Sequence, residues 1–166
     1  MAQELRIITT GGTFDKQYDA VKGELTFTES QLPKILAQSR CSLTVTLEEP
    51  LAVDSLFMTE QQRKEIAGAV KTSAESHVVV VHGTDTMVKT ATVTAELLGK
   101  DDPHVVVFTG AMIPYALEFS DAVFNLGCAI TSVQLLPPGV YVAMSGRIFP
   151  WDHVEKNKQK GLFETL

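Results

Sequence analysis

The residues best suited to chemistry form the turn His82-Gly83-Thr84-Asp85-Thr86. The turn offers two hydroxyls and a carboxylate, and it lies between the apolar run 78–81 and a helical pattern that starts near Met87. Backbone N–H groups at a helix N-terminus bind anions and polarise carbonyl groups. The turn therefore predicts a site for a small charged substrate. We interpret His82 itself as a packed residue at a strand end, not as a base.

A second turn, Thr10-Gly11-Gly12-Thr13, follows the strand-like residues 5–8. Its two glycines let the backbone approach a ligand or adopt a positive φ. A threonine hydroxyl beside them attacks a carbonyl group when its proton is removed. A strand-to-helix turn with a capping threonine explains the same residues nearly as well. We predict that the two turns face one pocket.

Two further segments are weaker candidates for the same site. Asp54-Ser55 ends another apolar stretch, so it faces the same edge if that stretch is a strand, and in isolation it is a turn. Lys156 lies in the charged run 155–160, whose composition alone favours a solvated loop.

The elements that must position these residues alternate along the chain. Strands apolar on both faces, alternating with helices, predict an α/β fold: a single-domain, three-layer sandwich with a mostly parallel sheet and helices on both faces. An open sheet of this kind binds its ligand at the carboxyl ends of the strands. We expect a mobile lid over 15–27 and a polar tail over 152–161. The expected strands are 4–9, 43–47, 77–82, 105–108 and 140–144, with an antiparallel extension at 147–149, and the expected helices are 30–39, one beginning at Thr59, 86–98 (Leu97 inward) and 120–135 (Val123 inward).

Composition narrows the class of protein. The chain has 166 residues, so we expect one domain over 1–166. The formal net charge of −6 and the lack of a basic block argue against nucleic acid as a partner. We see neither a signal peptide nor an apolar run long enough to cross a bilayer, so we expect a cytoplasmic protein without a membrane partner. Cys41 and Cys128 are interpreted as buried free thiols, and the four histidines do not cluster, so we predict no metal and no cofactor.

Together these residues resemble the bacterial-type L-asparaginase family. The segment 7–13 resembles the first active-site signature of that family, and 80–87 resembles the second. Supporting matches are Asp54-Ser55 followed by Met58, and the segments 109–112, 124–126 and 154–156.

The resemblance implies a role for each matched residue. Thr13 matches the nucleophilic threonine, and Tyr18 is matched to the tyrosine of the family's flexible loop. Lys156 matches the lysine that joins the central threonine and aspartate, here Thr84 and Asp85. The implied catalytic residues are Thr13, Tyr18, Thr84, Asp85 and Lys156, and the implied substrate-binding residues are Gly12, Asp54, Ser55, Gly83, Thr84 and Asp85.

The implied activity is hydrolysis of L-asparagine to L-aspartate and ammonia through a threonine acyl-enzyme, in asparagine catabolism. Asp85 would bind the α-ammonium group of the substrate, while Ser55 and turn N–H groups would bind its α-carboxylate. Two alternatives remain open: a non-catalytic amino-acid-binding or regulatory module, and an amidohydrolase acting on glutamine or another amide.

The sequence also departs from the family pattern. Phe14-Asp15 follows the first signature where an aliphatic and a small residue are usual, and Glu155 precedes the lysine where threonine is common. The match covers the family's larger N-terminal domain, and we expect its smaller C-terminal domain to be absent. The resemblance further implies a homodimer or homotetramer.

Overall fold

A computed structural model describes residues 4–166 of the chain. Its elements form one main sheet with helices packed on it, and the remainder are short hairpins and single turns. In chain order the strands and helices are β1 (Glu4–Thr9), β2 (Lys16–Asp19), β3 (Glu24–Phe27), α1 (Leu32–Gln38), β4 (Thr44–Glu48), α2 (Glu60–Lys71), β5 (His77–Val81), α3 (Met87–Leu98), β6 (Val105–Thr109), α4 (Ala122–Val133), β7 (Gly139–Met144), β8 (Arg147–Pro150), β9 (Val154–Asn157) and β10 (Leu162–Thr165), with the 3₁₀ helices η1 (Thr13–Asp15), η2 (Ser55–Phe57) and η3 (Trp151–His153).

The main sheet has six strands in the order β4-β1-β5-β6-β7-β8. All pairs are parallel except β7–β8, which is the expected antiparallel extension. Ile7 pairs with Val79, which in turn pairs with Val107, so three apolar strands form the centre of the sheet. The predicted single α/β domain with a mostly parallel sheet is confirmed.

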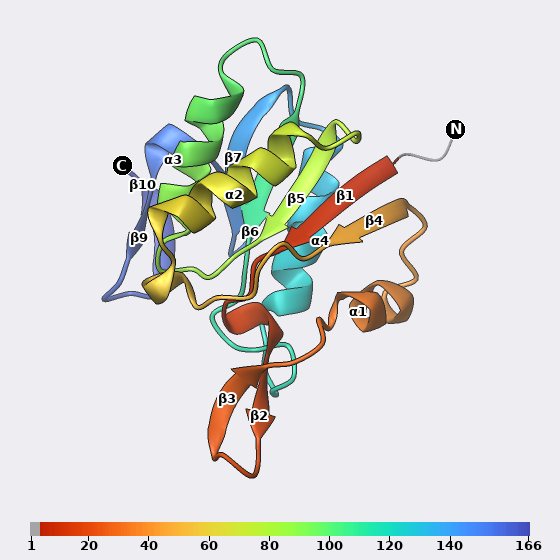
Figure 1. Ribbon diagram of the computed structural model, residues 1–166, viewed down its shortest axis with the longest axis vertical. Coiled ribbons are helices and arrows are strands. Elements are labelled where there is room, and N and C mark those ends of the chain that lie inside the picture. Colours follow the sequence, from red (N-terminus) through yellow and green to blue (C-terminus); the bar gives the residue numbers. More distant parts are fainter. Residues whose placement is uncertain (1–3) are drawn as a thin grey trace.

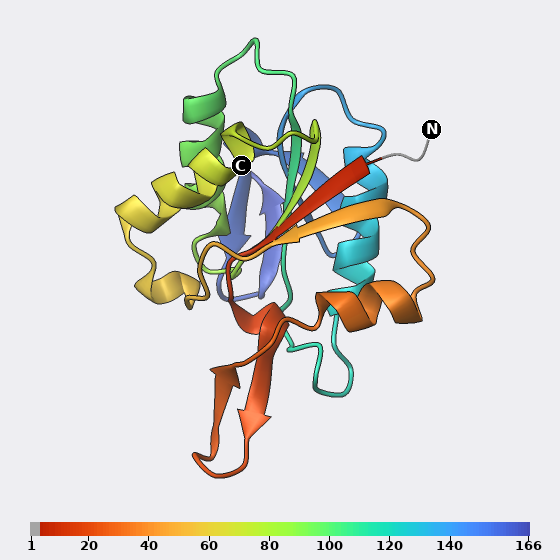
Figure 2. The same ribbon diagram turned by 45° about the vertical axis from the view of Figure 1, so that its right-hand side comes forward.

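Helices cover both faces of this sheet (Figures 1 and 2). Helices α2 and α3 lie on one face and α1 and α4 on the other. Each face has its own apolar core: Ile66, Met87 and Phe108 belong to the first, whereas Phe14, Ile35 and Leu126 belong to the second. The three-layer arrangement therefore buries the strands on both sides, which is why they read as unbroken apolar runs.

The ends of α2 and α3 agree with the capping signals in the sequence, whereas the buried faces of two helices differ from those that the periodicity predicts. Thr59 and Gln62 form the predicted capping box of α2, and Gly99, with φ +77°, ends α3. Leu97 and Val123 were expected to face inward, but their side chains are 49% and 39% exposed. Both expectations are wrong because each helix packs against the sheet through a stripe narrower than its apolar surface.

Two segments expected to be irregular form β-hairpins instead. Residues 16–27 fold as β2–β3, which projects from the body of the molecule (Figure 1), and Gly23 adopts a positive φ in its turn. Residues 154–165 fold as β9–β10, whose Val154 and Phe163 are buried in the core beside α3. The sequence did not reveal these strands because four-residue strands are too short to show a clear period.

Both cysteines are free thiols, and they are half-buried, not buried as expected. Within residues 4–166, no helix is long and apolar enough to cross a membrane.

Candidate active site

The candidate site is built from turns at the carboxyl ends of parallel strands. The turn 10–13 follows β1, and the turn 82–86 follows β5, which lies beside β1 in the sheet. A third segment, 52–55, leads into η2 and lies against the two turns. The backbone N–H of Thr10 donates to Val81 O at 3.0 Å, and Val53 N–H donates to Thr10 O at 3.0 Å. These hydrogen bonds hold the three segments in contact.

Glycines allow the three segments to touch. Gly12 has φ +80°, and a Cβ built on it would lie 2.5 Å from the backbone nitrogen of Gly83. A Cβ on Gly83 would in turn lie 2.5 Å from Ser55 Oγ. A side chain at either glycine would therefore force the turns apart. The structure thus brings together the two turns that were predicted to face one pocket, and Thr13 and Thr84 directly follow the two glycines in contact.

Lys156 reaches this site from β9, far along the chain. Its Nζ donates to Thr84 Oγ1 at 2.8 Å and to Asp85 Oδ1 at 2.8 Å. The lysine side chain is only 10% exposed, whereas that of Asp85 is 34% exposed. The β9–β10 hairpin positions it, because Lys156 pairs with Phe163, whose side chain is buried. A lysine in a charged run is thus a buried hydrogen-bond donor to the central turn.

Ser55 and Asp54 have different environments although they are neighbours. The Ser55 hydroxyl is buried and has no hydrogen-bond partner among the described residues. Asp54 accepts from the backbone N–H of Leu56 at 3.0 Å and forms an ion pair with Lys16 at 2.6 Å. Burial acts to raise the pKa of Asp54, but the hydrogen bonds from Lys16 and Leu56 outweigh it and lower the pKa. Asp54 therefore anchors the β2–β3 hairpin and caps η2.

The remaining predicted residues are less tightly placed. Thr13 is half-buried in η1, and its hydroxyl makes no hydrogen bond within residues 4–166. Tyr18 lies on β2 of the projecting hairpin and is 62% exposed. The structure brings Gly12, Ser55, Gly83, Thr84, Asp85 and Lys156 together and does not join Tyr18 to them.

Arg63 is a buried residue of this region that the sequence analysis missed. Its guanidinium donates to Thr86 Oγ1 at 3.0 Å, to Thr90 Oγ1 at 2.9 Å and to Met58 O at 3.1 Å. Thr86 passes the contact on, because its hydroxyl donates to Ser55 O at 2.8 Å. Arg63 thereby links η2, the central turn and α3. A basic residue on the inner face of a predicted amphipathic helix is the signal that could have revealed it.

His82 is a packed residue, as its position predicted. It is fully buried, and burial lowers its pKa to about 4, with the Arg63 guanidinium adding to the effect. The neutral ring donates from Nδ1 to Gly83 O at 2.7 Å and accepts at Nε2 from Thr90 at 2.8 Å. The ring therefore fixes the central turn and has no free nitrogen for proton transfer.

Asp15, the departure beside the first signature, is also a buried anchor. Its carboxylate accepts from Ser30 Oγ at 2.8 Å and from the backbone N–H of Gln31 at 2.9 Å. Burial raises its pKa against these two hydrogen bonds. Asp15 thus ties the segment after Thr13 to the start of α1.

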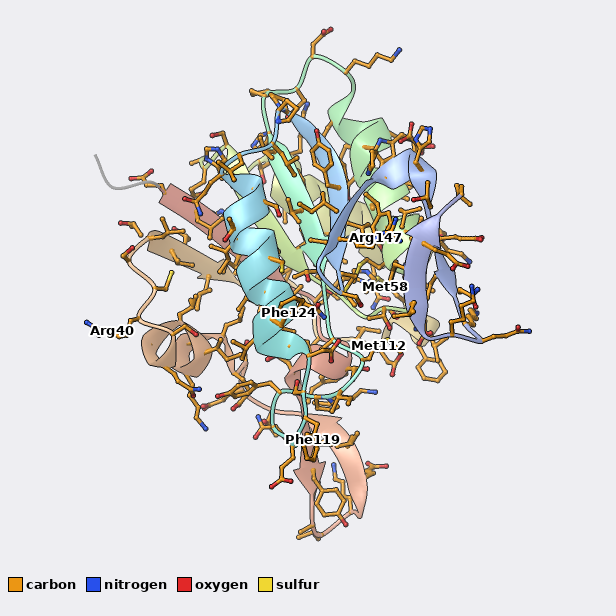
Figure 3. All side chains as sticks on the ribbon, turned by 180° about the vertical axis from the view of Figure 1, so that it is seen from behind. Arg40, Met58, Met112, Phe119, Phe124 and Arg147 are labelled. Atoms are coloured by element: carbon orange, nitrogen blue, oxygen red, sulfur yellow. The ribbon has the colours of Figure 1, made fainter. Side chains whose placement is uncertain are left out.

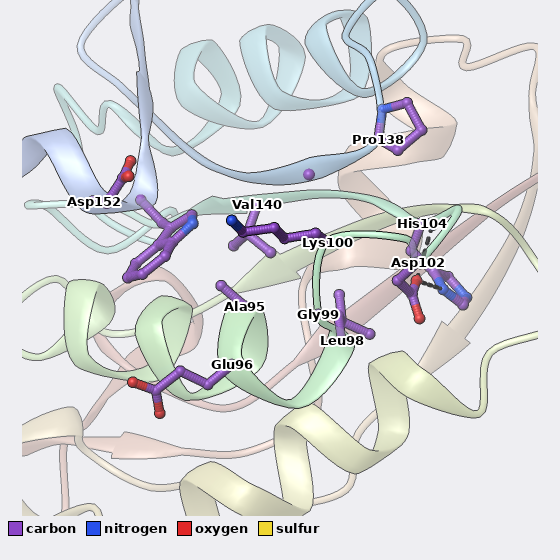
Figure 4. A pocket seen from close by; sticks show the side chains of 12 residues that line it. Ala95, Glu96, Leu98, Gly99, Lys100, Asp102, His104, Pro138, Val140 and Asp152 are labelled. Atoms are coloured by element: carbon purple, nitrogen blue, oxygen red, sulfur yellow. Dashed lines mark hydrogen bonds and ion pairs between the residues drawn. The ribbon is translucent and has the colours of Figure 1, made fainter.

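A cavity of about 460 Å³ lies at the opposite edge of the sheet, away from these turns (Figure 4). Leu98 at the end of α3, His104 before β6 and Val140 in β7 line it, which places it at the amino ends of the strands. It therefore does not belong to the candidate site. No group of three or more histidine, cysteine, aspartate or glutamate side chains within residues 4–166 is placed to hold a metal ion.

The fold and the site together define an α/β protein with threonine hydroxyls, a carboxylate and a lysine gathered at the carboxyl edge of a parallel sheet. The family model described as asparaginase, N-terminal, matches residues 4–163, and the chain belongs to this family.

Individual relatives carry several activities in their names. The chain is 32% identical over 114 residues to an L-asparaginase of Thermococcus kodakarensis, covering 68% of this chain and 34% of that protein. It is 28% identical over 162 residues to a glutaminase-asparaginase of Acinetobacter glutaminasificans, covering 90% and 48%. It is 31% identical over 147 residues to a glutamyl-tRNA(Gln) amidotransferase component of Archaeoglobus fulgidus, covering 86% and 35%.

A solved structure agrees with this relationship. The thermostable L-asparaginase of Thermococcus kodakarensis superposes with a TM-score of 0.87 at 26% identity, covering 99% of this chain and 51% of that one. The chain therefore spans between about a third and a half of the length of these relatives.

Proposed function

We propose that this chain is an amidohydrolase that converts L-asparagine to L-aspartate and ammonia through a threonine acyl-enzyme. The observation that carries the proposal is the contact of Lys156 Nζ with both Thr84 and Asp85 at 2.8 Å, next to the turn that holds Thr13. The Lys156 side chain is only 10% exposed, so its contacts with the hydroxyl and the carboxylate are largely shielded from solvent.

In the proposed reaction, Thr13 Oγ attacks the side-chain amide carbon of asparagine. Its proton passes through Thr84 to Lys156 and is returned to the amide nitrogen as the C–N bond breaks, so that the nitrogen leaves as ammonia. Backbone N–H groups of the glycine turns stabilise the oxyanion, and one such donor is typically worth about 10²–10³ in rate. Water then attacks the acyl-enzyme, which releases aspartate and regenerates the Thr13 hydroxyl.

Substrate binding is assigned to a hydroxyl that is unpaired within residues 4–166, to N–H groups of the glycine turns and to the partly exposed carboxylate of Asp85. The buried Ser55 hydroxyl, which lacks a partner among the described residues, would donate to the α-carboxylate, together with N–H groups of the Gly12 and Gly83 turns. Asp85 would take the α-ammonium group. We withdraw Asp54 as a direct ligand, because its carboxylate is already held by Lys16 and Leu56.

Asp85 would contact two cations once substrate is bound. Its Oδ1 already lies 2.8 Å from Lys156 Nζ as an ion pair. The substrate ammonium group would share this carboxylate with Lys156, which also contacts Thr84 Oγ1.

The test is ammonia release from L-asparagine by Thr13→Ala. We expect loss of nearly all turnover with an unchanged melting temperature, because removing the nucleophile affects kcat. Thr13→Ser retains a hydroxyl and should retain measurable activity, and Thr44→Ala, an exposed threonine at the start of β4, should behave as the parent does. A Thr13→Ala protein with more than about a tenth of parental turnover would reject the assignment, since that is less than about 1.4 kcal/mol of barrier.

A second candidate is the same chemistry on glutamine or on an amide of a larger carrier. The relatives named as a glutaminase-asparaginase and as a glutamyl-tRNA(Gln) amidotransferase component support it. Glutamine has one more methylene group, which moves its amide from Thr13 when the α-groups stay anchored, and a displacement of about 1 Å can cost roughly 10² in rate. We therefore expect asparagine to be preferred. Comparable kcat/KM values for the two amino acids would contradict this preference.

A non-catalytic binding module is the remaining alternative. It predicts L-aspartate or L-asparagine binding without ammonia release, which calorimetry beside the ammonia assay distinguishes. We also propose that the protein is cytoplasmic and that it forms a homodimer or homotetramer. The oligomer is supported by large apolar side chains that are exposed in one chain, such as Phe57, Phe119 and Phe124. Light scattering that returned the 18.1 kDa mass of one chain would contradict the oligomer.

A further inference from the structure

Met112 differs from the other methionines of residues 4–166 in its exposure. Its side chain is 40% exposed, whereas Met58, Met87 and Met144 are between 0% and 6% exposed. Met112 lies beyond the carboxyl end of β6, close to the start of α4 (Figure 3). Solvent oxidants therefore reach the Met112 sulfur much more readily than that of these three.

The loop that carries Met112 lies beside two other parts of the molecule, the start of α4 and the β9–β10 hairpin. The backbone N–H groups of Met112 and Ile113 donate to the carboxylate of Asp121 at 3.0 Å. At its other end, the Met112 methyl group would lie 3.6 Å from a Cβ built on Gly161, in the turn between β9 and β10. The side chain thus lies between the start of α4 and the hairpin that supplies Lys156.

This placement brings the thioether sulfur to the central turn. The Thr84 hydroxyl donates to Met112 Sδ at 3.5 Å, while the same oxygen accepts from Lys156 Nζ at 2.8 Å. A thioether is a weak acceptor, so the Thr84 proton is easily redirected towards another partner. Met58 has a comparable contact with Thr90 at 3.7 Å but is buried. The two methionines therefore differ in access to solvent more than in hydrogen bonding.

We propose that Met112 is an oxidative modification site, at which hydrogen peroxide converts the thioether to a sulfoxide and blocks the adjoining Thr84. The inference rests on the proposed function, because it assigns Thr84 to proton transfer. A sulfur lone pair attacks one peroxide oxygen, the S–O bond forms as the O–O bond breaks, and the departing hydroxide takes a proton to leave as water. The sulfur loses two electrons and the peroxide gains them.

The product changes both the polarity and the volume beside Thr84. A sulfoxide oxygen is a strong acceptor, so it holds the Thr84 hydroxyl proton and removes it from the route between Thr13 and Lys156. The added oxygen also occupies space beside the Thr84 hydroxyl. We expect kcat/KM for asparagine to fall at least about ten-fold. Methionine sulfoxide reductases reduce both sulfoxide epimers and should restore activity.

The experiment treats the purified chain with hydrogen peroxide in a Cys41→Ser/Cys128→Ser background, which removes thiol oxidation. Peptide mass spectrometry follows the addition of one oxygen at each methionine, and ammonia release is measured on the same samples. Met112→Leu and the buried-site control Met144→Leu are treated in parallel, and each protein is compared with its own untreated sample. Leucine and methionine are close in volume, so both variants should fold.

We expect Met112 to be oxidised first, and activity to fall with the extent of its oxidation and to return with the reductases. Met112→Leu should resist peroxide and Met144→Leu should not. Oxidation of Met112 without loss of activity, or equal loss in Met112→Leu, would overturn the inference. If the untreated chain releases no ammonia, the proposed function fails. The effect of Met112 oxidation is then tested by calorimetry, which measures the binding of L-aspartate before and after peroxide treatment. Binding weakened about ten-fold by Met112 oxidation would support it, and unchanged binding would overturn it.

Discussion

Replacing Arg63 with methionine should separate a positioning role from general stability. The Arg63 side chain is 4% exposed, and its guanidinium joins three segments that surround the candidate site. Methionine keeps an unbranched chain that reaches about as far as Nε of arginine, but it has no donor. The substitution therefore removes the hydrogen bonds and leaves most of the packing.

The expected loss of stability follows from which partners remain satisfied. Thr86 still donates to Ser55 O, and Thr90 still donates to His82, so neither hydroxyl is orphaned. The carbonyl of Met58 loses its donor, and an unsatisfied buried group costs about 1–3 kcal/mol. Removing a buried charge offsets part of what the other hydrogen bonds contributed. We expect the free energy of unfolding to fall by about 1–3 kcal/mol, or about 2–4 °C in melting temperature per kcal/mol.

Kinetics test whether the network positions substrate-binding groups. With Arg63 gone, Thr86 and the Ser55 segment bonded to it are no longer tied to α2, so KM for asparagine should rise about ten-fold while kcat changes less. Arg63→Lys should recover part of the KM effect. Glu60→Gln removes only the exposed partner of Arg63, whose side chain is 72% exposed, and should change stability by less than about 0.5 kcal/mol. An Arg63→Met protein with parental stability and parental KM would refute the reasoning.

Three further outcomes are expected. Lys156→Met should lower kcat at least about 10²-fold with little loss of stability, because general acid–base groups contribute about 10²–10⁴ in rate. The control Lys160→Met changes a lysine that is 62% exposed and should leave kcat unchanged. Equal effects of the two substitutions would contradict the role of Lys156. Gly12→Ala should lower the free energy of unfolding by more than about 2 kcal/mol in chemical denaturation, because the new Cβ would lie 2.5 Å from backbone. Gly23→Ala is the control: its Cβ has no neighbour within 4 Å, so it should cost about 1–2 kcal/mol of backbone strain alone. Equal losses of stability in the two variants would refute the close approach of the turns at Gly12. His82 binds a proton below about pH 6.5 in the unfolded state but only below about pH 4 in the folded state. Its contribution to stability is therefore complete above pH 6.5, and the free energy of unfolding falls by about 3 kcal/mol as the pH falls to 4. His82→Gln should reduce this dependence of stability on pH, and an unchanged slope would contradict the lowered pKa.

Much of the fold could be predicted because its signals are local. The runs 78–81 and 105–108 have no polar residue, which is typical of strands covered on both faces, and Thr59 with Gln62 marks the start of α2. The two hairpins could not be predicted in the same way. Strands of four residues carry too few positions to show a period, and the antiparallel pairing of β9 with β10 depends on packing of Phe163 against the core.

The candidate site shows the same division. The sequence by itself determined the glycine turns, since positive φ and close backbone approach demand residues without a Cβ. It also determined the threonines and the aspartate beside them. The family resemblance already implied that Lys156 joins Thr84 and Asp85. Only the tertiary structure decided that the Lys156 side chain is 10% exposed, that Asp54 is held by Lys16, and that Arg63 is buried and bonded to Thr86. Charged side chains carry no periodic signal of their own, so their burial depends on partners that are distant in sequence and meet only when the sheet and hairpins assemble.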